Sequence, residues 1–396
     1  MMMPQLRFPE FTDEWTVTKL KDVSQRGQYG MNAAAKTYDG INKYLRITDI
    51  DEESRKILEA GLTSPDAKLE DKYLLADKDI LFTRTGASTG KSYLYDSADG
   101  RVYFAGFLIR FHINNAVPSF VYSQTLRAEY AKWVTTVSAR SGQPGINAEE
   151  YGLYIFFQPS IPEQQKIADF LTTVDDKITA LDKKVELLKQ YKKGVMQQIF
   201  SQQVRFKDEN GQNYPEWEEK KLNEVFKERL DKGGADRRML SVTINSGIVP
   251  FSEGGRKDSS SANKSNYKHV ELNDIAYNSM RMWQGASGVS RYTGIVSPAY
   301  TVITTNPSND PTFWGYYFKL RKTIQTFERN SQGLTSDTWN LKYSALSKIQ
   351  LHAPLKSEQQ KIADLLTTLD DKITAEQTRL DAAKEWKKGL LQRMFV

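Results

Sequence analysis

Apolar residues recur along one stretch of the chain with the spacing of a coiled-coil helix. The apolar positions of this first run are Ile167, Leu171, Val174, Ile178, Leu181, Val185 and Leu188. The steps between them alternate between four and three residues, a 3.5-residue period that predicts a helix burying a narrow stripe against a second helix. Pro162 precedes the run and no proline interrupts it, so we expect one helix from Glu163 to Phe200, about 57 Å long.

The same stretch occurs a second time, 195 residues later. Residues 163–179 read EQQKIADFLTTVDDKIT and residues 358–374 read EQQKIADLLTTLDDKIT, so that 15 of 17 positions are identical. An internal repeat of this quality indicates a duplicated structural unit. Since each helix needs a partner for its apolar stripe and the two stripes nearly match, we expect the two helices to pack against each other.

The second copy differs from the first in its later half. Its seam breaks at Glu376 and resumes at Leu380, and we expect Trp386, Leu390 and Met394 to continue the apolar face. The helical pattern nevertheless extends across the whole stretch, so a second long helix is predicted.

The repeated unit is larger than the helix. Leu6-Arg-Phe8 and Lys19-Leu-Lys-Asp-Val23 in the first half correspond to Val204-Arg-Phe206 and Lys221-Leu-Asn-Glu-Val225 in the second. Each half therefore consists of an opening segment, a globular region and one long helix. The predicted boundaries are 1–160 and 201–355 for the two globular domains, and 161–200 and 356–396 for the helices.

The globular regions show short strand-like and helical runs in the same order. In the first half we expect strands at 44–47, 79–83, 102–107, 109–113 and 153–157, and a helix at 119–137. In the second half we expect a helix at 312–326, a loop at 331–336 and a strand at 346–351. The predicted fold class is α+β: two pseudo-repeated α/β domains joined by two long helices that form an antiparallel coiled-coil spacer.

Composition narrows the class of protein. The net charge of +6 mildly favours an anionic partner. The absence of cysteine excludes disulfides, cysteine-ligated zinc and thiol nucleophiles, and agrees with a cytosolic, that is cytoplasmic, protein. No apolar run approaches 18 residues, so we expect no membrane span.

Catalytic patterns are missing from the sequence. The three histidines, at 112, 269 and 352, lack metal-ligand spacing, and no GxSxG elbow or paired carboxylate set stands out. The run Gly86-Ala-Ser-Thr-Gly-Lys-Ser92 has three residues between its glycines, whereas the Walker pattern needs four. The matching run, Gly285-Ala-Ser-Gly-Val-Ser290, has no lysine. We therefore expect a protein that is not itself an enzyme.

With its doubled Pro…Glu-Gln-Gln-x-Ile-Ala helix start and its doubled Leu/Val-Arg-Phe…Trp…Lys-Leu opening, the chain resembles the specificity subunit of a type I restriction-modification enzyme. The resemblance covers essentially the whole chain. It implies two target recognition domains that each read one half of a bipartite DNA site, and paired helices that hold them apart and dock two methyltransferase subunits. Two restriction subunits complete the enzyme. S-adenosylmethionine, ATP and Mg²⁺ then belong to the partner subunits, and none is expected in this chain.

The geometry of such a spacer is compatible with bipartite DNA. Antiparallel helices would relate the two halves by an approximate two-fold axis. A spacer on the ~50 Å scale would set the domains one to one and a half DNA turns apart, at ~34–36 Å per turn. Because the two globular regions differ in sequence, we expect two different half-sites separated by a gap of unspecified bases.

Candidate DNA-binding residues are polar or basic and lie beside glycines at corresponding places in the two halves. Arginine and amide side chains read base edges, whereas lysine, serine and backbone N–H groups bind phosphates. In the first half the candidates are Arg84, Thr85, Ser88, Lys91, Arg140, Ser141 and Gln143. In the second half they are Arg281, Gln284, Ser290, Arg291, Asn330 and Gln332. We interpret Trp283 as a packing residue.

An alternative interpretation is a structural adaptor, with two protein-binding domains on a coiled-coil rod. A basic stripe shared by both domains would favour DNA, whereas two apolar patches would favour protein partners. The sequence does not identify the recognised bases or the gap length.

Overall fold

The chain of 396 residues folds into two compact units in a computed structural model, which describes residues 3–139, 142–234, 236–244, 246–253, 263–335 and 338–396. Unit 1 consists of Met1–Lys184 together with Glu376–Val396, and unit 2 consists of Val185–Ala375. Each unit therefore contains part of both long helices. Within the described ranges, no helix is long and apolar enough to cross a membrane.

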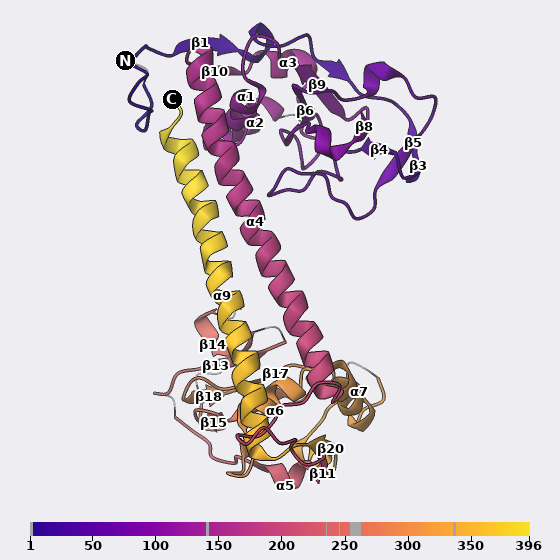
Figure 1. Cartoon of the computed structure of the whole chain (residues 1–396), viewed down its shortest axis with the longest axis vertical. Helices are drawn as coiled ribbons and strands as arrows, with labels where there is room; N and C mark the ends of the chain where they lie inside the picture. Colours follow the sequence, from indigo (N-terminus) through magenta and orange to yellow (C-terminus); the bar gives the residue numbers. More distant parts are fainter. Residues whose placement is uncertain (1–2, 140–141, 235, 245, 254–262, 336–337) are drawn as a thin grey trace. The chain divides into compact units, whose positions relative to one another are not determined.

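Unit 1 contains a four-stranded antiparallel sheet together with two-stranded sheets and short helices (Figure 1). The order of the sheet is β2 (Gln28–Tyr29), β9 (Leu108–His112), β6 (Asp79–Thr83) and β7 (Ser92–Leu94). The two-stranded sheets are β1 (Thr16–Lys19) with β10 (Ile155–Gln158), β3 (Ala34–Thr37) with β5 (Thr63–Asp66), and the parallel pair β4 (Asn42–Leu45) with β8 (Arg101–Phe104). The short helices are α1 (Pro118–Gln124), α2 (Ala128–Ser138) and α3 (Ala148–Gly152).

Unit 2 repeats this plan. Its four-stranded antiparallel sheet has the order β12 (Phe226–Glu228), β19 (Tyr300–Thr305), β16 (Ile275–Asn278) and β17 (Ser287–Val289). The two-stranded sheets are β11 (Glu218–Lys221) with β20 (Gln350–Ala353), β13 (Leu240–Thr243) with β14 (Gly247–Pro250), and β15 (Lys268–Val270) with β18 (Gly294–Val296). The short helices are α5 (Leu222–Val225), α6 (Pro311–Tyr317), α7 (Arg321–Asn330) and α8 (Tyr343–Leu346).

Three element predictions are wrong in the same way, because the apolar pattern continues across a break in the backbone. The helix expected at 119–137 is two helices, α1 and α2, separated at Arg127, whose backbone is extended. The helix expected at 312–326 is likewise α6 and α7, separated at Leu320. The strand expected at 346–351 is the end of α8 followed by β20. No proline or glycine marks these breaks, so local sequence carried no signal for them.

The two long helices are α4 (Ile161–Phe200) and α9 (Lys356–Arg393), and they pack antiparallel inside each unit. In unit 1, Lys387 pairs with Asp175 at 2.6 Å and Lys184 pairs with Glu376 at 2.7 Å. A later residue of α4 therefore meets an earlier residue of α9. In unit 2, Lys192 pairs with Asp370 at 2.6 Å. The pairs 175–387 and 370–192 are equivalent under the 195-residue repeat, so the duplicated sequence makes duplicated contacts.

Each long helix ends in the core of the unit that contains the start of the other helix. Phe395, which is 3 % exposed, packs on Trp15 and Phe120 in unit 1. Its equivalent Phe200 packs on Trp217 and Phe313 in unit 2. Each globular core is therefore completed by a residue from the opposite repeat.

The repeated glutamate at the start of each helix makes a buried ion pair with the opening segment. The Glu163 carboxylate accepts from the Arg7 guanidinium at 2.7 and 2.8 Å. The Glu358 carboxylate accepts from Arg205 at 2.8 and 3.2 Å. Both glutamate side chains are 1 % exposed, and the hydrogen bond to each raises the pKa of its arginine.

The glutamine that follows each glutamate is also structural. The Gln164 amide oxygen accepts from the backbone N–H of Val117, directly before α1, at 3.0 Å. The Gln359 oxygen accepts from Asp310 N, directly before α6, at 2.8 Å. These bonds satisfy N–H groups next to helix starts, where no intrahelical partner exists. The repeat is thus explained by buried polar contacts as well as by the seam.

One prediction for the second copy needs correction, and the break in its seam is explained by an ion pair. Glu376, where the seam breaks, is buried, and its carboxylate accepts from Lys184 and Arg379, with Lys184 the leading cause of its lowered pKa. Trp386, expected on the apolar face, is 54 % exposed and touches Phe170 only edge-on. The seam position of Glu376 is therefore occupied by an ion pair, and the Trp386 ring lies outside the seam.

Candidate nucleic-acid interface

The loop that follows β6 in unit 1 and the loop that follows β16 in unit 2 have the same length and are closed by the same backbone hydrogen bond. In unit 1, Thr83 N donates to Lys91 O at 2.8 Å across the β6–β7 loop (84–91). In unit 2, Asn278 N donates to Ala286 O at 2.9 Å across the β16–β17 loop (279–286). Thr83 is therefore equivalent to Asn278, and Lys91 to Ala286.

This register corrects the one expected from sequence. The repeated Gly-Ala-Ser letters suggested that Gly86 corresponds to Gly285, but the backbone pairing makes Gly90 the equivalent of Gly285 and Gly86 the equivalent of Arg281. Gly90 and Gly285 both have positive φ, +89° and +80°. Gly86 has positive φ as well, +77°, so it is the cross-loop hydrogen bond that aligns the two loops.

A second loop packs against the first in each unit. Ile146 N, in the α2–α3 loop (139–147), donates to Arg84 O at 2.9 Å. Leu341 N, in the α7–α8 loop (331–342), donates to Ser279 O at 2.8 Å. Two loops that are distant in sequence therefore form one continuous surface in each unit.

In unit 1 this surface brings together three of the predicted residues. The Arg84 guanidinium lies over the Tyr29 ring, 4.8 Å from its centroid, and Thr85 forms a β-bridge with Gly145. Gln143 is exposed, and its amide lies over Gly86. Arg84, Thr85 and Gln143 are thus neighbours that can present a guanidinium, a hydroxyl and an amide. The predicted residues Arg140 and Ser141 lie outside the described residues.

The geometry of unit 1 does not favour a phosphate contact by Lys91. Its side chain is 7 % exposed, and its ammonium donates to Ile50 O at 3.0 Å and pairs with Glu52 at 2.6 Å. Ser88 is half-buried, and its carbonyl accepts a hydrogen bond from the Thr83 hydroxyl. Lys91 therefore holds this loop to the segment that follows β4.

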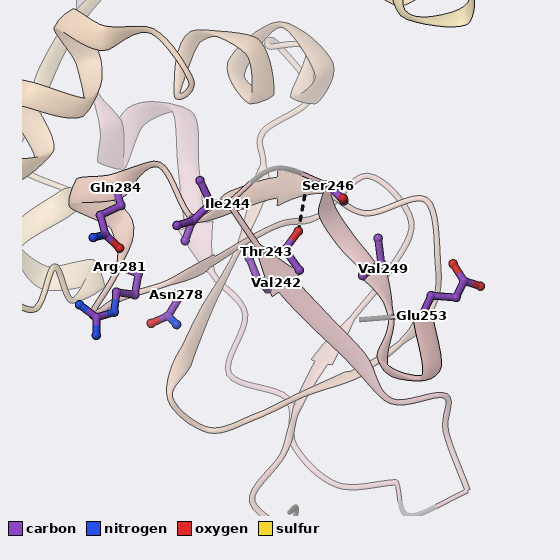
Figure 2. A pocket seen from close by; sticks show the side chains of 10 residues that line it. Val242, Thr243, Ile244, Ser246, Val249, Glu253, Asn278, Arg281 and Gln284 are labelled. Carbon is purple, nitrogen blue, oxygen red and sulfur yellow. Dashed lines mark hydrogen bonds between the residues drawn. The ribbon is translucent and has the colours of Figure 1, made fainter. Parts of the chain in front are cut away.

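In unit 2 an open cavity of about 750 Å³ lies between the β13–β14 hairpin (240–250) and the β16–β17 loop. Its polar lining residues are Thr243, Ser246, Glu253, Asn278, Arg281 and Gln284. Figure 2 shows them, with Thr243, Ser246 and Glu253 from the hairpin and the segment that follows it, and Asn278, Arg281 and Gln284 from the end of β16 and its loop. Arg281 and Gln284, both predicted, therefore share one site.

Sequence reasoning missed Asn278 and the hairpin residues of this site. Asn278 is the last residue of β16, and the candidates were sought only among the loop residues that follow the strand. The hairpin was not predicted at all. The available signal was the asparagine that ends a buried strand, at the position where unit 1 has Thr83.

The other predicted residues of unit 2 lie elsewhere. Ser290 is 1 % exposed and its hydroxyl donates to Tyr292 O at 2.6 Å, so it does not face solvent. Neither it nor the exposed Arg291 lines the cavity. Asn330, at the end of α7, donates to Thr326 O at 2.9 Å. Gln332 is exposed, and its backbone pairs with Asn340 at the base of the α7–α8 loop.

Trp283 connects the two loops of unit 2. Its ring meets Trp339 edge-to-face, with centroids 5.3 Å apart, and its indole N–H donates to Met280 O at 3.0 Å. These contacts agree with the predicted packing role.

The chemistry of the cavity suits recognition. Arg281, Gln284 and Asn278 offer donors and acceptors of the kind that read base edges. Among the described lining residues Glu253 is the one carboxylate, and acid–base catalysis by carboxylates uses a positioned pair. Lys319 lies behind the cavity, and burial lowers the pKa of its ammonium to about 8.

Comparisons with known proteins agree with this architecture. Residues 12–190 and 214–385 match the family described as "Type I restriction modification DNA specificity domain". The chain is 23 % identical, over 98 % of its length and 94 % of the relative, to the "Putative type I restriction enzyme MjaX specificity subunit" of Methanocaldococcus jannaschii. It is 25 % identical, over 56 % of its length and 51 % of the relative, to the MjaVIII specificity subunit of the same organism.

A solved structure has the same fold. The crystal structure of the type I restriction-modification S subunit from M. genitalium matches with a TM-score of 0.63 at 16 % identity, covering 100 % of this chain and 99 % of that one. Two family matches of this extent, one for each repeat, account for most of the sequence. The chain belongs to the type I restriction-modification DNA specificity family.

Proposed function

We propose that this chain is the non-catalytic subunit that gives a type I restriction-modification complex its DNA sequence specificity. The domain at 1–160 reads one half of a bipartite asymmetric site in double-stranded DNA, and the domain at 201–355 reads the other half. The chain then directs adenine methylation and restriction that are carried out by partner subunits. S-adenosylmethionine, ATP and Mg²⁺ are bound by those partners.

One observation carries the proposal: the two units keep one backbone plan while the side chains at equivalent loop positions differ. Thr83 corresponds to Asn278 and Gly86 to Arg281, on loops of equal length with the same cross-loop hydrogen bond. Base identity is read by side chains on a positioned backbone. An asymmetric site with two halves requires two domains of the same fold that carry different base-contacting side chains.

The long helices supply the gap and the docking surface in this proposal. Tyr191 is 60 % exposed and Trp386 is 54 % exposed, and the two occupy equivalent positions 195 residues apart. Equivalent exposed aromatic residues suit two copies of one partner, since aromatic residues are enriched at protein interfaces. We assign these partners as two methyltransferase subunits, with two restriction subunits completing the complex.

The test is to express the chain with its methyltransferase partner and to map methylated adenines across a host genome by single-molecule sequencing. The expected result is one bipartite motif with a fixed gap, methylated once on each strand. A complex that forms but methylates no such motif would overturn the proposal and favour the adaptor alternative.

A second variant tests the spacer. Seven residues, two helical turns that keep the seam in phase, are inserted into each of α4 and α9. The gap should lengthen while both half-sites keep their sequence. A changed half-site with an unchanged gap would contradict the assignment of the helices.

A further inference from the structure

In each unit a lysine side chain connects the β6–β7 or β16–β17 loop to a neighbouring segment. The two lysines do not occupy equivalent positions in the repeat. In unit 1 the lysine is Lys91, whose ammonium donates to Ile50 O at 3.0 Å. In unit 2 the equivalent of Lys91 is Ala286, and the ammonium is supplied by Lys319, just after α6. The position of Lys319 corresponds to Leu126 in unit 1, because α1 and α6 begin at equivalent prolines eight residues earlier.

Lys319 joins the two walls of the cavity. Its ammonium donates to Ile244 O in the β13–β14 hairpin at 2.9 Å and to Gly285 O in the β16–β17 loop at 2.7 Å. The strand after the loop also approaches the hairpin closely, because a Cβ on Gly288 in β17 would lie 2.8 Å from the Cα of Gly247. The Lys319 ammonium therefore links the hairpin to the loop beside a close approach of the two backbones.

Because unit 2 has Ala286 at the position of Lys91, no lysine side chain fills the space beside its β16–β17 loop. In unit 1 the Lys91 stem runs inward from the start of β7, and in unit 2 the short Ala286 at that place lines the cavity. The lysine exchange thus keeps the loop anchored and exposes the end of β16, where Asn278 lies.

The Asn278 side chain has an unused donor toward this space. Its Oδ1 accepts from Met280 N at 3.1 Å, and within the described part of the chain its amide NH₂ donates to no other group. Asn278 is half-buried and lines the cavity beside Arg281 and Gln284 (Figure 2). A fixed, half-buried amide of this kind is a recognition group, since an NH₂ held in place discriminates between acceptors and donors.

We propose that Asn278 reads a base of the second half-site from within this cavity, and that Lys319 is the positioning residue that holds the walls of the cavity around it. The inference rests on the proposed function and deepens it. The NH₂ donates to an acceptor on the major-groove edge, which purines and thymine present and cytosine does not. Asn278 therefore excludes cytosine at one position of the second half-site.

The experiment uses the complex of the full chain with its methyltransferase partner. The wild-type motif is first mapped on a genome. Methylation is then measured on duplexes of that motif in which each position of the second half-site is changed in turn. Asn278→Ala should lower the discrimination against cytosine at one position by roughly 5- to 150-fold and leave the first half-site unchanged. Asn278→Asp, which offers only acceptors, should prefer cytosine there. Gln212→Ala, an exposed amide outside the cavity, is the matched control.

Lys319 is tested in the same assay. Lys319→Met should weaken discrimination throughout the second half-site, and Lys319→Arg should restore most of it. If Lys319→Met instead lowers methylation equally on every duplex, its role is stability alone and the positioning assignment is overturned.

The failures are distinguishable. A wild-type complex that methylates no bipartite motif overturns the proposed function itself. A wild-type complex with a bipartite motif that neither Asn278 variant alters overturns only the role of Asn278.

Discussion

The β6–β7 loop of unit 1 and the β16–β17 loop of unit 2 begin and end alike but differ in between, since Gly86 has a φ of +77° and Arg281, at the equivalent position, has −129°. Both are eight residues long and closed by the same hydrogen bond, yet the first carries Gly86 where the second carries Arg281. The first is anchored by Lys91 and the second by Lys319. In both loops a lysine ammonium donates to a backbone carbonyl, but the lysine occupies a different sequence position in each unit. The exposed positions of the loop are therefore free to change.

The scaffold beneath these loops differs much less. The Arg7–Glu163 and Arg205–Glu358 pairs are equivalent in the two units, and so are the repeat-related pairs Lys387–Asp175 and Lys192–Asp370, both at 2.6 Å. Five experiments test this difference between a constant scaffold and variable loops.

The largest effect is expected where a buried carboxylate loses its cation. Arg7→Met and Arg205→Met should each lower the free energy of unfolding by about 3–5 kcal/mol, because Glu163 and Glu358 are left charged and buried. Urea denaturation followed by tryptophan fluorescence measures the loss. The double replacement Arg7→Met with Glu163→Met removes the buried charge and should cost less than Arg7→Met alone; an equal or greater cost would contradict this explanation.

The exchange of helix ends predicts where a core mutation acts. Phe395→Ala should cost about 3–5 kcal/mol, since Phe395 is buried against Trp15 and Phe120. Hydrogen exchange should show lost protection in unit 1, although the residue lies in the second repeat. Phe200→Ala is the matched variant, with its effect in unit 2. Loss of protection in the opposite unit for either variant would overturn the assignment.

A pair of glutamines tests the two recognition surfaces separately. Gln143→Ala should relax only the first half-site and Gln284→Ala only the second, each by about 1–3 kcal/mol of discrimination at one base. Methylation of duplexes with single base changes measures this. A uniform loss on all sequences would instead identify a phosphate contact.

The pH dependence of stability tests the lysine anchor of unit 2. Burial lowers the pKa of Lys319 to about 8 from the ordinary value of 10.5. Between these pH values the unfolded chain holds more protons than the folded chain, so folding becomes more favourable as pH rises. The stability of the wild type relative to Lys319→Met should therefore increase from pH 8 to 10.5 and stay constant below pH 8. Thermal unfolding of both proteins across this range is the measurement, and a relative stability that falls would reverse the sign of the argument.

The smallest effect is expected for the ion pairs between the long helices. Lys192→Met and Lys387→Met should each change the free energy of unfolding by about 0–1 kcal/mol, because these side chains are partly exposed and screened. The loss should be larger for Lys192→Met, because the Lys192 ammonium also lies over the Tyr316 ring, 4.7 Å from its centroid, and Asp370 accepts from the Tyr316 hydroxyl. A larger loss for Lys387→Met would contradict this explanation.

The sequence predicts those helices and strands whose residues form a strong local pattern. The seam from Ile167 to Leu188 specified the first long helix, which the structure places at Ile161–Phe200. The strand at Asp79–Thr83 was predicted to the residue. The family resemblance rested on the doubled Glu-Gln-Gln motif, whose buried contacts with Arg7, Val117 and their equivalents are the same in both units.

The candidate site was predictable only in part, because burial and loop register are tertiary properties. Lysine and serine are residue types that often bind phosphates. The side chains of Lys91 and Ser290 nevertheless point inward and donate to backbone carbonyls. Asn278 is equivalent to Thr83 both by the 195-residue repeat and by the cross-loop hydrogen bond, but only the tertiary structure shows that it lines a cavity.

The sequence by itself therefore determined the duplication, the two long helices and the family, since these depend on periodicity and on residues that recur at fixed spacing. The tertiary structure decided which loop residues share a surface, which lysine anchors each loop and where a cavity opens. Those outcomes depend on contacts between segments 30 to 75 residues apart, as between Lys319 and Ile244 or Gly285, and no local pattern records them.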